Sequence, residues 1–183
     1  MKKNADPSRA QLSEADELGH EARSVRGDHA ALKLWLRLLA CTAQVEAEIS
    51  RRLRQRFGIS LPRFDYLAQV HRRPEGLKMG DLSRCLMVTG GNVTGLTDEL
   101  TREGLVQREA SPGDRRAWIV RLTDAGRSSF EAMASEHERW ILELFAGLDA
   151  EALQQVYRQL GSLRVHLMNL PARDLDTEAQ NKP

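Results

Sequence analysis

The sequence predicts a mainly α-helical fold with a small two-stranded β-wing, in which a winged helix-turn-helix unit lies between long N- and C-terminal dimerisation helices. Apolar residues recur at helical spacing over long stretches near both ends of the 183-residue chain. The centre contains two shorter helical stretches separated by few residues, and two β-type stretches around a turn follow them. The length suits one compact domain, or two small units that share a core.

The overall charge does not indicate a partner, because 27 Lys and Arg residues balance 26 Asp and Glu residues and the formal net charge is +1. A surface for an acidic partner such as DNA must therefore come from the local placement of basic residues. The longest apolar stretch, Leu34–Cys41, is interrupted by Arg37 and is far shorter than the roughly 20 residues that span a bilayer. We therefore expect no membrane partner.

The two ends of the chain are polar. Residues 1–29 contain no apolar run of the secretory type, so we expect a disordered N-terminal arm on a cytoplasmic protein, and residues 171–183 are expected to be a disordered tail. Cys41 and Cys85 fit a reducing compartment and are expected to be small core residues. They form no CxxC pair, and the histidines have no i, i+4 pair, so we expect neither a metal site nor a cofactor.

The first two helices are predicted from apolar spacing and from stop signals. Residues 30–60 are the predicted dimerisation helix, and Gly58 is the signal for its end. Pro62 suits the first turn of a second, shorter helix, which ends where Arg73 precedes Pro74. This second helix begins the winged helix-turn-helix unit, which covers residues 61–122.

Two short helices with a tight connection come next and predict a helix-turn-helix. The first begins near Lys78–Asp81 and ends around Met87. The second is capped by Thr89 and closes at Glu103, before Gly104. The residues expected to point inward are Leu82, Cys85 and Leu86 in the first helix and Val93, Leu96 and Leu100 in the second.

A β-hairpin follows the helix-turn-helix. Leu105–Glu109 and Ala117–Leu122 are predicted strands around a turn at Ser111–Asp114, and Thr123 caps the next helix. A hairpin in this place is the wing of a winged helix-turn-helix.

The outward face of the second short helix carries small and polar residues. In a helix-turn-helix, this helix enters the major groove and its N-terminal part reaches the base edges. Asn92 and Thr94 can hydrogen-bond base edges, while Gly91 and Gly95 allow close approach of the backbone. With Thr89 they form the predicted base-reading set. The alternative is an ordinary surface helix in which Thr and Asn merely favour the first turn.

Arg115 and Arg116 lie on the protruding turn of the wing, where they can reach phosphates or enter a narrow minor groove. Asp114 can hold one of them in a salt bridge. A charged hairpin tip is elsewhere only a solvated turn. Its position directly after a helix-turn-helix favours DNA contact here.

Residues 123–170 contain two helical stretches, broken around Gly147–Asp149, that are predicted to serve dimerisation. In the second stretch apolar residues alternate steps of three and four, as in a helix that packs along another helix. These residues are Leu153, Val156, Leu160, Leu163, Leu167 and Leu170. An intramolecular core is one explanation. A second subunit is the other, because the long helices have more apolar surface than the short centre can cover.

The sequence resembles the MarR family from Ala31 to Asn169. The run GLVQREASPGDRRAWIVRLTDAGR resembles the wing of that family and the start of the helix that follows it. LPRFDYLAQV resembles the start of the family's second helix, and TGGNVTGLTDELTREG resembles its recognition helix. The most specific features are Gly104, Leu105, Val106, the DRR tip, Leu122, Thr123 and Gly126 at the family's spacing.

The resemblance implies a homodimer whose first and last helices intertwine. Its two recognition helices would enter major grooves of a pseudo-palindromic site, with centres roughly 10 base pairs apart. Arg116 would approach the flanking minor groove with Asp114 orienting it, and Ser83, Arg84 and Arg115 would contact phosphates. Members of the family commonly repress transcription, so we expect a repressor that occludes its promoter.

The resemblance also implies a small-molecule effector. Regulators of this family commonly release DNA when a small aromatic or phenolic acid, or a related thioester, binds between the dimer helices and the winged unit. Trp35, Phe64, Tyr66 and Trp140 are candidate aromatic walls, and Arg63 or His71 can meet a carboxylate. The alternative for each is an ordinary core or surface residue.

Other functions have less support in the sequence. GxSxG, HExxH and a phosphate-binding Gly-rich loop followed by Lys-Ser or Lys-Thr are all missing, so we expect no enzyme. Redox regulation through Cys41 is an alternative, although the family's redox-sensing position falls near Trp35. A winged-helix module that contacts only proteins is a further alternative, which loss of the wing arginines would distinguish.

Overall fold

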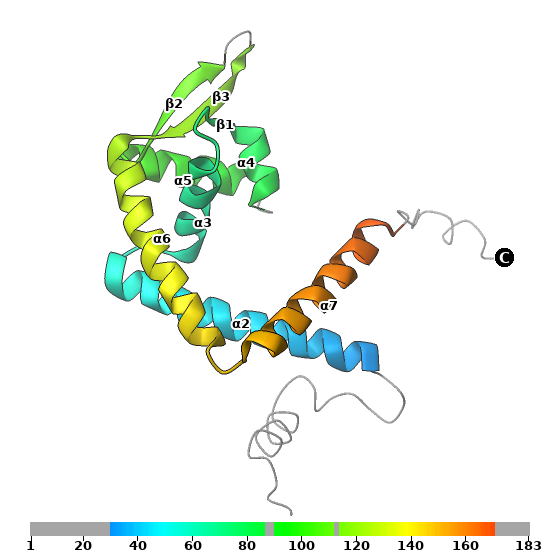
Figure 1. The fold of residues 1–183 in the computed structure, drawn as a ribbon. Coiled ribbons are helices and arrows are strands. Elements are labelled where there is room, and N and C mark those ends of the chain that lie inside the picture. Colours follow the sequence, from blue (N-terminus) through cyan, green and yellow to red (C-terminus); the bar gives the residue numbers. More distant parts are fainter. Residues whose placement is uncertain (1–29, 87–89, 112–113, 171–183) are drawn as a thin grey trace, which may run out of the picture. The chain divides into compact units, whose positions relative to one another are not determined.

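The structure, a computed structural model, describes residues 30–86, 90–111 and 114–170. It confirms the predicted fold class, because the described chain is mostly helical with one small antiparallel sheet (Figure 1). The chain divides into two compact units, the first ending at Trp140 and the second beginning at Ile141. The predicted arm and tail lie outside the described residues.

The two predicted helices at the start of the first unit are present. Helix α2 spans Ala30–Phe57 and ends at Gly58, whose φ of 66° is a left-handed conformation that suits glycine. Helix α3 spans Leu61–His71 and has Pro62 in its first turn. In α2 the buried residues are Ile49 and Leu53, so only its C-terminal part packs against the described core.

The sheet contains the predicted hairpin and a third strand that the sequence did not predict. Strands β1 (Leu77–Lys78), β2 (Val106–Ser111) and β3 (Asp114–Leu122) lie in the order β1-β3-β2, with antiparallel pairing throughout. A strand of two residues is too short to give a visible alternation of apolar and polar residues, and the predicted helix begins near Lys78, the second of the two. β2 and β3 also run farther toward the wing tip than predicted.

The helix-turn-helix consists of α4 (Met79–Cys85) and α5 (Gly90–Arg102), which contact each other. Helices α3 and α4 contact β3, and α5 contacts β2, so these helices cover the sheet (Figure 1). Gly104 follows α5 with a φ of 72° and turns the chain into β2. The predicted cap Thr89 lies outside the described residues.

The core of the first unit joins all of these elements. Its fully buried aliphatic residues come from α2, α3, α4, α5, β2 and β3, and they are Leu53, Leu67, Val70, Leu82, Val93, Leu100, Val106 and Val120. Full burial of one such side chain contributes about 1.5–3 kcal/mol. The winged unit therefore holds the C-terminal part of α2 through a continuous apolar core.

The junction between wing and α6 (Asp124–Phe145) explains two residues of the predicted motif. The Thr123 hydroxyl accepts a hydrogen bond from the Gly126 backbone N–H at 2.9 Å, which confirms the predicted cap. Thr123 Oγ1 also donates to the Gly104 carbonyl oxygen at 2.6 Å. Gly126 is buried, and a Cβ atom there would collide with the carbonyl oxygen of Leu105. Glycine is therefore required where α6 crosses the end of α5.

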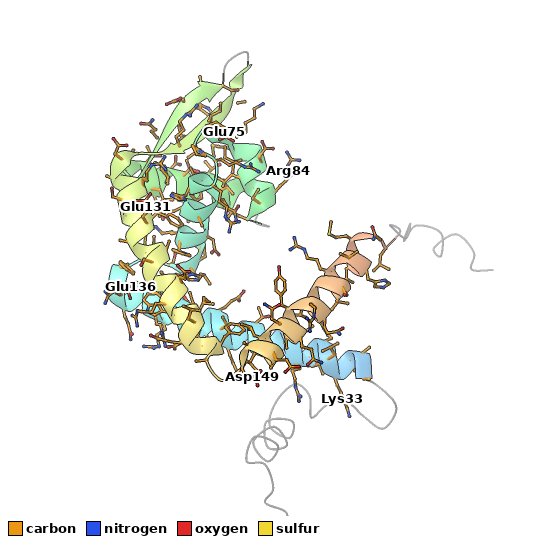
Figure 2. The ribbon with its side chains drawn as sticks, viewed as in Figure 1. Lys33, Glu75, Arg84, Glu131, Glu136 and Asp149 are labelled. Atoms are coloured by element: carbon orange, nitrogen blue, oxygen red, sulfur yellow. The ribbon has the colours of Figure 1, made fainter. Side chains whose placement is uncertain are left out.

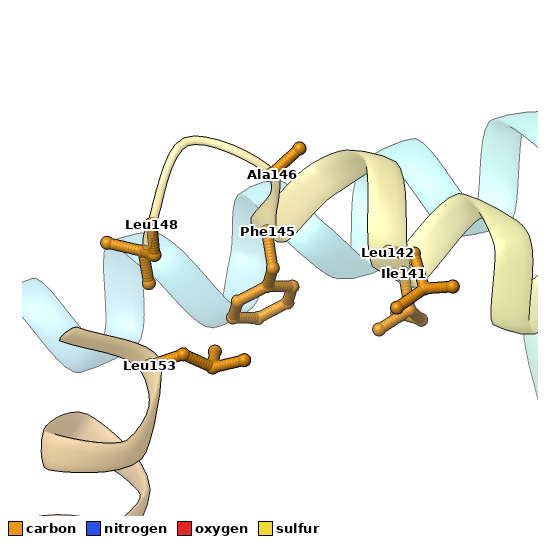
Figure 3. Close-up of a pocket in the computed structure, with 6 residues that line it drawn as sticks. All are labelled: Ile141, Leu142, Phe145, Ala146, Leu148 and Leu153. Carbon is orange, nitrogen blue, oxygen red and sulfur yellow. The ribbon is translucent and has the colours of Figure 1, made fainter. Parts of the chain in front are cut away.

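The second unit contains the end of α6 and helix α7 (Ala150–Met168). Asp149 caps α7 by accepting from the Ala152 N–H at 2.8 Å. None of the residues of α7, all of which are described, is buried. An apolar groove lies at the α6–α7 connection, between residues such as Leu142, Phe145 and Leu153 (Figure 3).

Two expectations about single residues have an outcome here. Cys41 and Cys85 are exposed rather than core residues; Cys41 lies in the N-terminal part of α2, where no described residue is buried, and Cys85 is the last residue of the short α4. In α5, Leu96 is only half-buried, while Thr97 is fully buried. Within the described residues there is no cluster of potential metal ligands. No described helix has the length and apolar character that crossing a membrane requires.

Candidate nucleic-acid interface

Helix α5 has one buried face and one exposed face. Val93, Thr97 and Leu100 are buried, and their spacing of four and three places them on one side of the helix. Thr94, Gly95 and Asp98 are exposed on the other side. The structure therefore places Thr94 and Gly95, two of the predicted base-reading residues, where a partner can reach them. Gly91 and Asn92 belong to the first turn of α5, and the Asn92 side chain lies outside the described structure.

A buried hydrogen bond fixes α5 on α3. The Thr97 hydroxyl donates to the Val93 carbonyl oxygen at 2.7 Å, so its only proton is already used. The Tyr66 hydroxyl, 2.6 Å from Thr97 Oγ1, is therefore the donor in that pair. Burial raises the pKa of Tyr66 to about 12, which keeps the phenol protonated. Tyr66 thus holds the rotation of α5, and with it the direction of the exposed face.

The wing is attached to the helices by two arginines. Arg108 on β2 forms an ion pair with Asp98 on α5. Arg121 on β3 binds Glu109 on β2 at 3.2 Å and donates to the Pro74 carbonyl oxygen at 3.1 Å, before β1. These contacts link β2 to α5, and β3 to β2 and to the turn before β1, at the base of the wing.

The two strands of the wing stay paired up to Ser111 and Asp114, next to the tip. Ser111 pairs with Asp114, and the register shifts between Ala110 and Ser111. Asp114, Arg115 and Arg116 start β3, so their backbone belongs to the strand instead of the predicted turn. The side chains of these three residues lie outside the described structure, and so does the predicted salt bridge of Asp114.

Helix α4 carries the predicted phosphate contacts. Arg84 has 81% of its side chain exposed and projects outward from α4 (Figure 2). It pairs with Asp81 one turn earlier. Such an exposed pair contributes at most about 1 kcal/mol, so the guanidinium can exchange this partner for a phosphate. Ser83 is half-buried on the same helix.

Trp118 is a surface residue of the wing that the sequence reasoning missed. It lies on β3, paired across the hairpin with Ala110, and its side chain is 46% exposed. Strand alternation places Trp118 on the same face as Val120, which is fully buried against the helices. The available signal was the segment AWIVRL, in which Trp118 continues the apolar face of Val120 and Leu122 toward the tip.

Comparison with known proteins identifies the relatives of this chain. A family model described as MarR family matches residues 57–117. The HTH-type transcriptional regulator YdgJ of Bacillus subtilis (strain 168) is 31% identical over 115 residues, which are 63% of this chain and 70% of YdgJ. A crystal structure of a MarR family transcriptional regulator from Silicibacter pomeroyi is 33% identical, with a TM-score of 0.67 over 78% of this chain and 99% of that one. The chain belongs to the MarR family.

This MarR-family chain is therefore a DNA-binding transcriptional regulator, and its relatives are regulators rather than enzymes. Its fold is also that of the MepR–DNA complex of Staphylococcus aureus, with 24% identity and a TM-score of 0.62 over 71% of this chain and 94% of that one. The matched residues 57–117 contain α3, the helix-turn-helix and most of the wing.

The candidate effector residues of this MarR-family protein fall into separate groups. Phe64 and His71 face α6, where the Phe64 ring lies 4.9 Å from His137 and the His71 ring lies 4.7 Å from Phe130. Arg63 pairs with Glu103, directly after α5, and Tyr66 bonds Thr97 on α5. Trp35 is 56% exposed on α2, whereas Trp140 is buried near Phe57. The five predicted effector residues, Trp35, Arg63, Phe64, Tyr66 and His71, therefore do not converge on one site within the described part of the chain.

Two titratable residues, Asp65 and His137, lie next to Phe64 in the sequence and in the structure, respectively. Burial lowers the pKa of His137 and raises the pKa of Asp65, so burial disfavours the charged form of each. Their mutual attraction acts in the opposite sense for both. His137 therefore favours the neutral imidazole against the ring of Phe64.

Proposed function

We propose that the protein is a homodimeric repressor that occludes a promoter by binding a pseudo-palindromic site and that a small ligand releases it. The observation that carries this proposal is the exposed face of α5, held in one orientation by Tyr66 and Thr97 beside the base of a wing. The MepR–DNA complex, which has this fold, supports a DNA-bound state of the same kind.

The proposed DNA contacts divide by role. Asn92, Thr94, Gly91, Gly95 and Thr89 would read or approach the bases, because they belong to the start of the recognition helix or its cap. Ser83, Arg84 and Arg115 would contact phosphates, while Arg116, oriented by Asp114, would enter the minor groove. Trp118 would contact the sugar-phosphate backbone beside the wing, because its half-exposed indole continues the helix-facing side of the hairpin.

The proposed dimer uses residues 30–60 and 123–170. Support comes from apolar side chains that the described chain leaves exposed on α2, α6 and α7 and just after α7, which are Leu32, Leu34, Trp35, Leu39, Leu142, Phe145, Leu153, Val156, Leu160, Leu167 and Leu170. A monomeric soluble protein rarely exposes so many neighbouring apolar residues along its helices. In a two-fold symmetric dimer, the apolar faces of the two subunits pack against each other and are removed from water.

Fluorescence anisotropy with the DNA upstream of the gene, combined with in vitro transcription, tests the proposal. We expect saturable binding that weakens steeply with salt, loss of transcript on binding, and reversal by one member of a panel of aromatic acids and thioesters. Arg116→Ala should weaken binding to all sites, whereas Arg54→Ala, an exposed arginine on α2, should not. An increase in transcript would make the protein an activator, and parent-like binding by Arg116→Ala would contradict the proposed wing contact.

Redox control remains a second candidate because Cys41 is exposed. The same anisotropy assay decides it. If oxidation releases the parent from DNA but not the Cys41→Ser variant, Cys41 is the signal; if the two proteins respond alike, it is not.

A further inference from the structure

A groove with basic walls lies between the C-terminal part of α2 and the end of α6. Its volume is about 310 Å³. Arg52, Gln55 and Arg56 of α2 line one side of it, and Arg139 and Trp140 of α6 line the other. All five residues belong to the first unit. This arginine groove takes no part in the proposed DNA contacts.

Two neighbouring aromatic rings hold two of the guanidiniums in place. The ring centroids of Phe57 and Trp140 lie 6.2 Å apart. Arg52 lies over the Trp140 ring, with its Cζ 5.9 Å from the centroid, and Arg56 lies over the Phe57 ring at 5.8 Å. A guanidinium that lies over an aromatic face uses its π surface for this contact, so its in-plane N–H groups can still bind an acceptor. Arg52 and Arg56 are therefore preorganised on the α2 side of the groove.

Positive charge exceeds negative charge around the arginine groove. Two glutamates each accept hydrogen bonds from two arginines, and these groups are Glu48 with Arg51 and Arg52, and Glu136 with Arg56 and Arg139. The hydrogen bonds from the two arginines lower the pKa of Glu48 to about 2. Glu143 is exposed one turn after Arg139 on α6, and the four arginines outnumber the carboxylates even when it is counted. The described residues around the groove therefore favour an anion.

We propose that the arginine groove binds the phosphoryl group of a small solute. A phosphoryl group carries up to two negative charges and several acceptor oxygens, so Arg52, Arg56 and Arg139 can each donate to a different oxygen. The planar fork of a guanidinium matches this geometry, and the Gln55 amide adds a neutral donor. An apolar or aromatic acid fits less well, because Trp140 is buried and the other lining residues are polar.

The position of the groove favours a free solute over the phosphates of DNA. Figure 2 shows Glu136 beside α2, well separated from Arg84 on α4. The exposed apolar residues of α2 that are proposed for the dimer lie in its N-terminal half, away from the groove. Arg56 and Arg139 keep 57% and 56% of their side chains exposed, so a solute can reach them. A bound phosphoryl group would link α2 to α6 and stabilise their contact.

Calorimetric titration of the full-length protein with inorganic pyrophosphate tests the site, at constant ionic strength and with acetate as the control anion. We expect saturable binding of pyrophosphate and none of acetate. Arg56→Gln and Arg139→Gln should each weaken pyrophosphate binding about tenfold or more, because each removes a charged donor. Arg54→Gln is the matched control, since it removes the same charge from an exposed position on the other flank of α2. It should change the affinity less than about twofold.

Glu136→Gln provides a test in the opposite direction. Removal of a carboxylate that competes for Arg56 and Arg139 should tighten pyrophosphate binding about two- to fivefold, as expected for exposed ion pairs. Three results would overturn the proposed site: no saturable binding by the parent, an equal loss in Arg54→Gln, or weaker binding by Glu136→Gln.

Thermal unfolding and DNA binding distinguish a free solute from the DNA backbone. Pyrophosphate should raise the unfolding temperature of the parent more than that of Arg139→Gln, because a ligand that binds only the folded state stabilises it. In the anisotropy assay, Arg139→Gln should bind DNA as tightly as the parent at the same salt concentration. If Arg139→Gln loses DNA affinity together with pyrophosphate binding, the groove holds a DNA phosphate and the proposed solute is wrong.

Discussion

At the scale of single residues, a few buried contacts set the direction in which the recognition helix faces. Tyr66 donates to Thr97, and Thr97 donates to the backbone of its own helix at Val93. The exposed residues Thr94 and Gly95 owe their direction to this arrangement. The proposed base contacts would therefore depend on two buried residues, Tyr66 and Thr97.

Tyr66→Phe should lower the free energy of unfolding by about 1–2 kcal/mol, because it removes a buried hydrogen bond and leaves Thr97 without its donor. Urea unfolding followed by circular dichroism measures the change. Tyr157→Phe is the matched control, since Tyr157 is 76% exposed on α7, and its effect should stay within about 0.5 kcal/mol. Equal effects of the two substitutions would show that the Tyr66 hydroxyl does not stabilise the fold.

His137 should make stability depend on pH. Burial lowers its pKa in the folded state, so the unfolded state binds more protons below the ordinary value of about 6.5. The free energy of unfolding therefore falls as the pH decreases through that value toward the lowered pKa. Thermal unfolding of the parent and His137→Phe from about pH 8 to about pH 5.5 tests this. The parent should lose more stability than the variant, and parallel losses would contradict the assignment.

At the scale of elements, the fold depends on a close crossing between α6 and the turn after α5. Gly126→Ala should lower stability by about 1–3 kcal/mol, because the added methyl group collides with the Leu105 carbonyl and the backbone must shift. Gly80→Ala is the matched control in the same unit, where an added Cβ meets open space. Its effect should be neutral or stabilising by up to about 1 kcal/mol. If thermal unfolding shows that Gly126→Ala is as stable as the parent, the contact between α6 and the Leu105 carbonyl is not as close as described here.

The helix boundaries are the features that the sequence predicts best. Glycines and prolines at helix ends are local signals, so α2, α3 and the cap at Thr123 follow directly from Gly58, Pro62 and Thr123. The family pattern locates the wing. Each of these signals depends only on residues close by in the sequence, so the helix ends can be predicted without the tertiary structure.

Features that depend on distant partners were not predictable in the same way. β1 is a strand only because Leu77 and Lys78 pair with Val120 and Ile119, far along the chain. Thr97 is polar, so its burial follows from Tyr66 on another helix. The candidate effector residues share only aromatic or basic character in the sequence, and they separate in the structure because neighbouring positions of α3 face different helices.

At the scale of the whole molecule, the proposed dimer places a second subunit on the apolar faces of α2, α6 and α7. Leu160→Glu should convert the dimer to monomers, because it places a charge in the predicted seam of α7. Sedimentation velocity measures the mass. Tyr157→Glu, one turn away and outside the seam, should remain dimeric. A dimer that survives Leu160→Glu unchanged would place the interface elsewhere.

In the proposed complex, two copies of the α5 and wing surface bind one pseudo-palindromic site. Hydroxyl-radical footprinting on the upstream DNA tests it most directly. We expect two symmetric protected regions with centres roughly 10 base pairs apart, and flanking protection that Arg116→Ala loses while the central regions remain. A single asymmetric footprint, or flanking protection that Arg116→Ala retains, would contradict it.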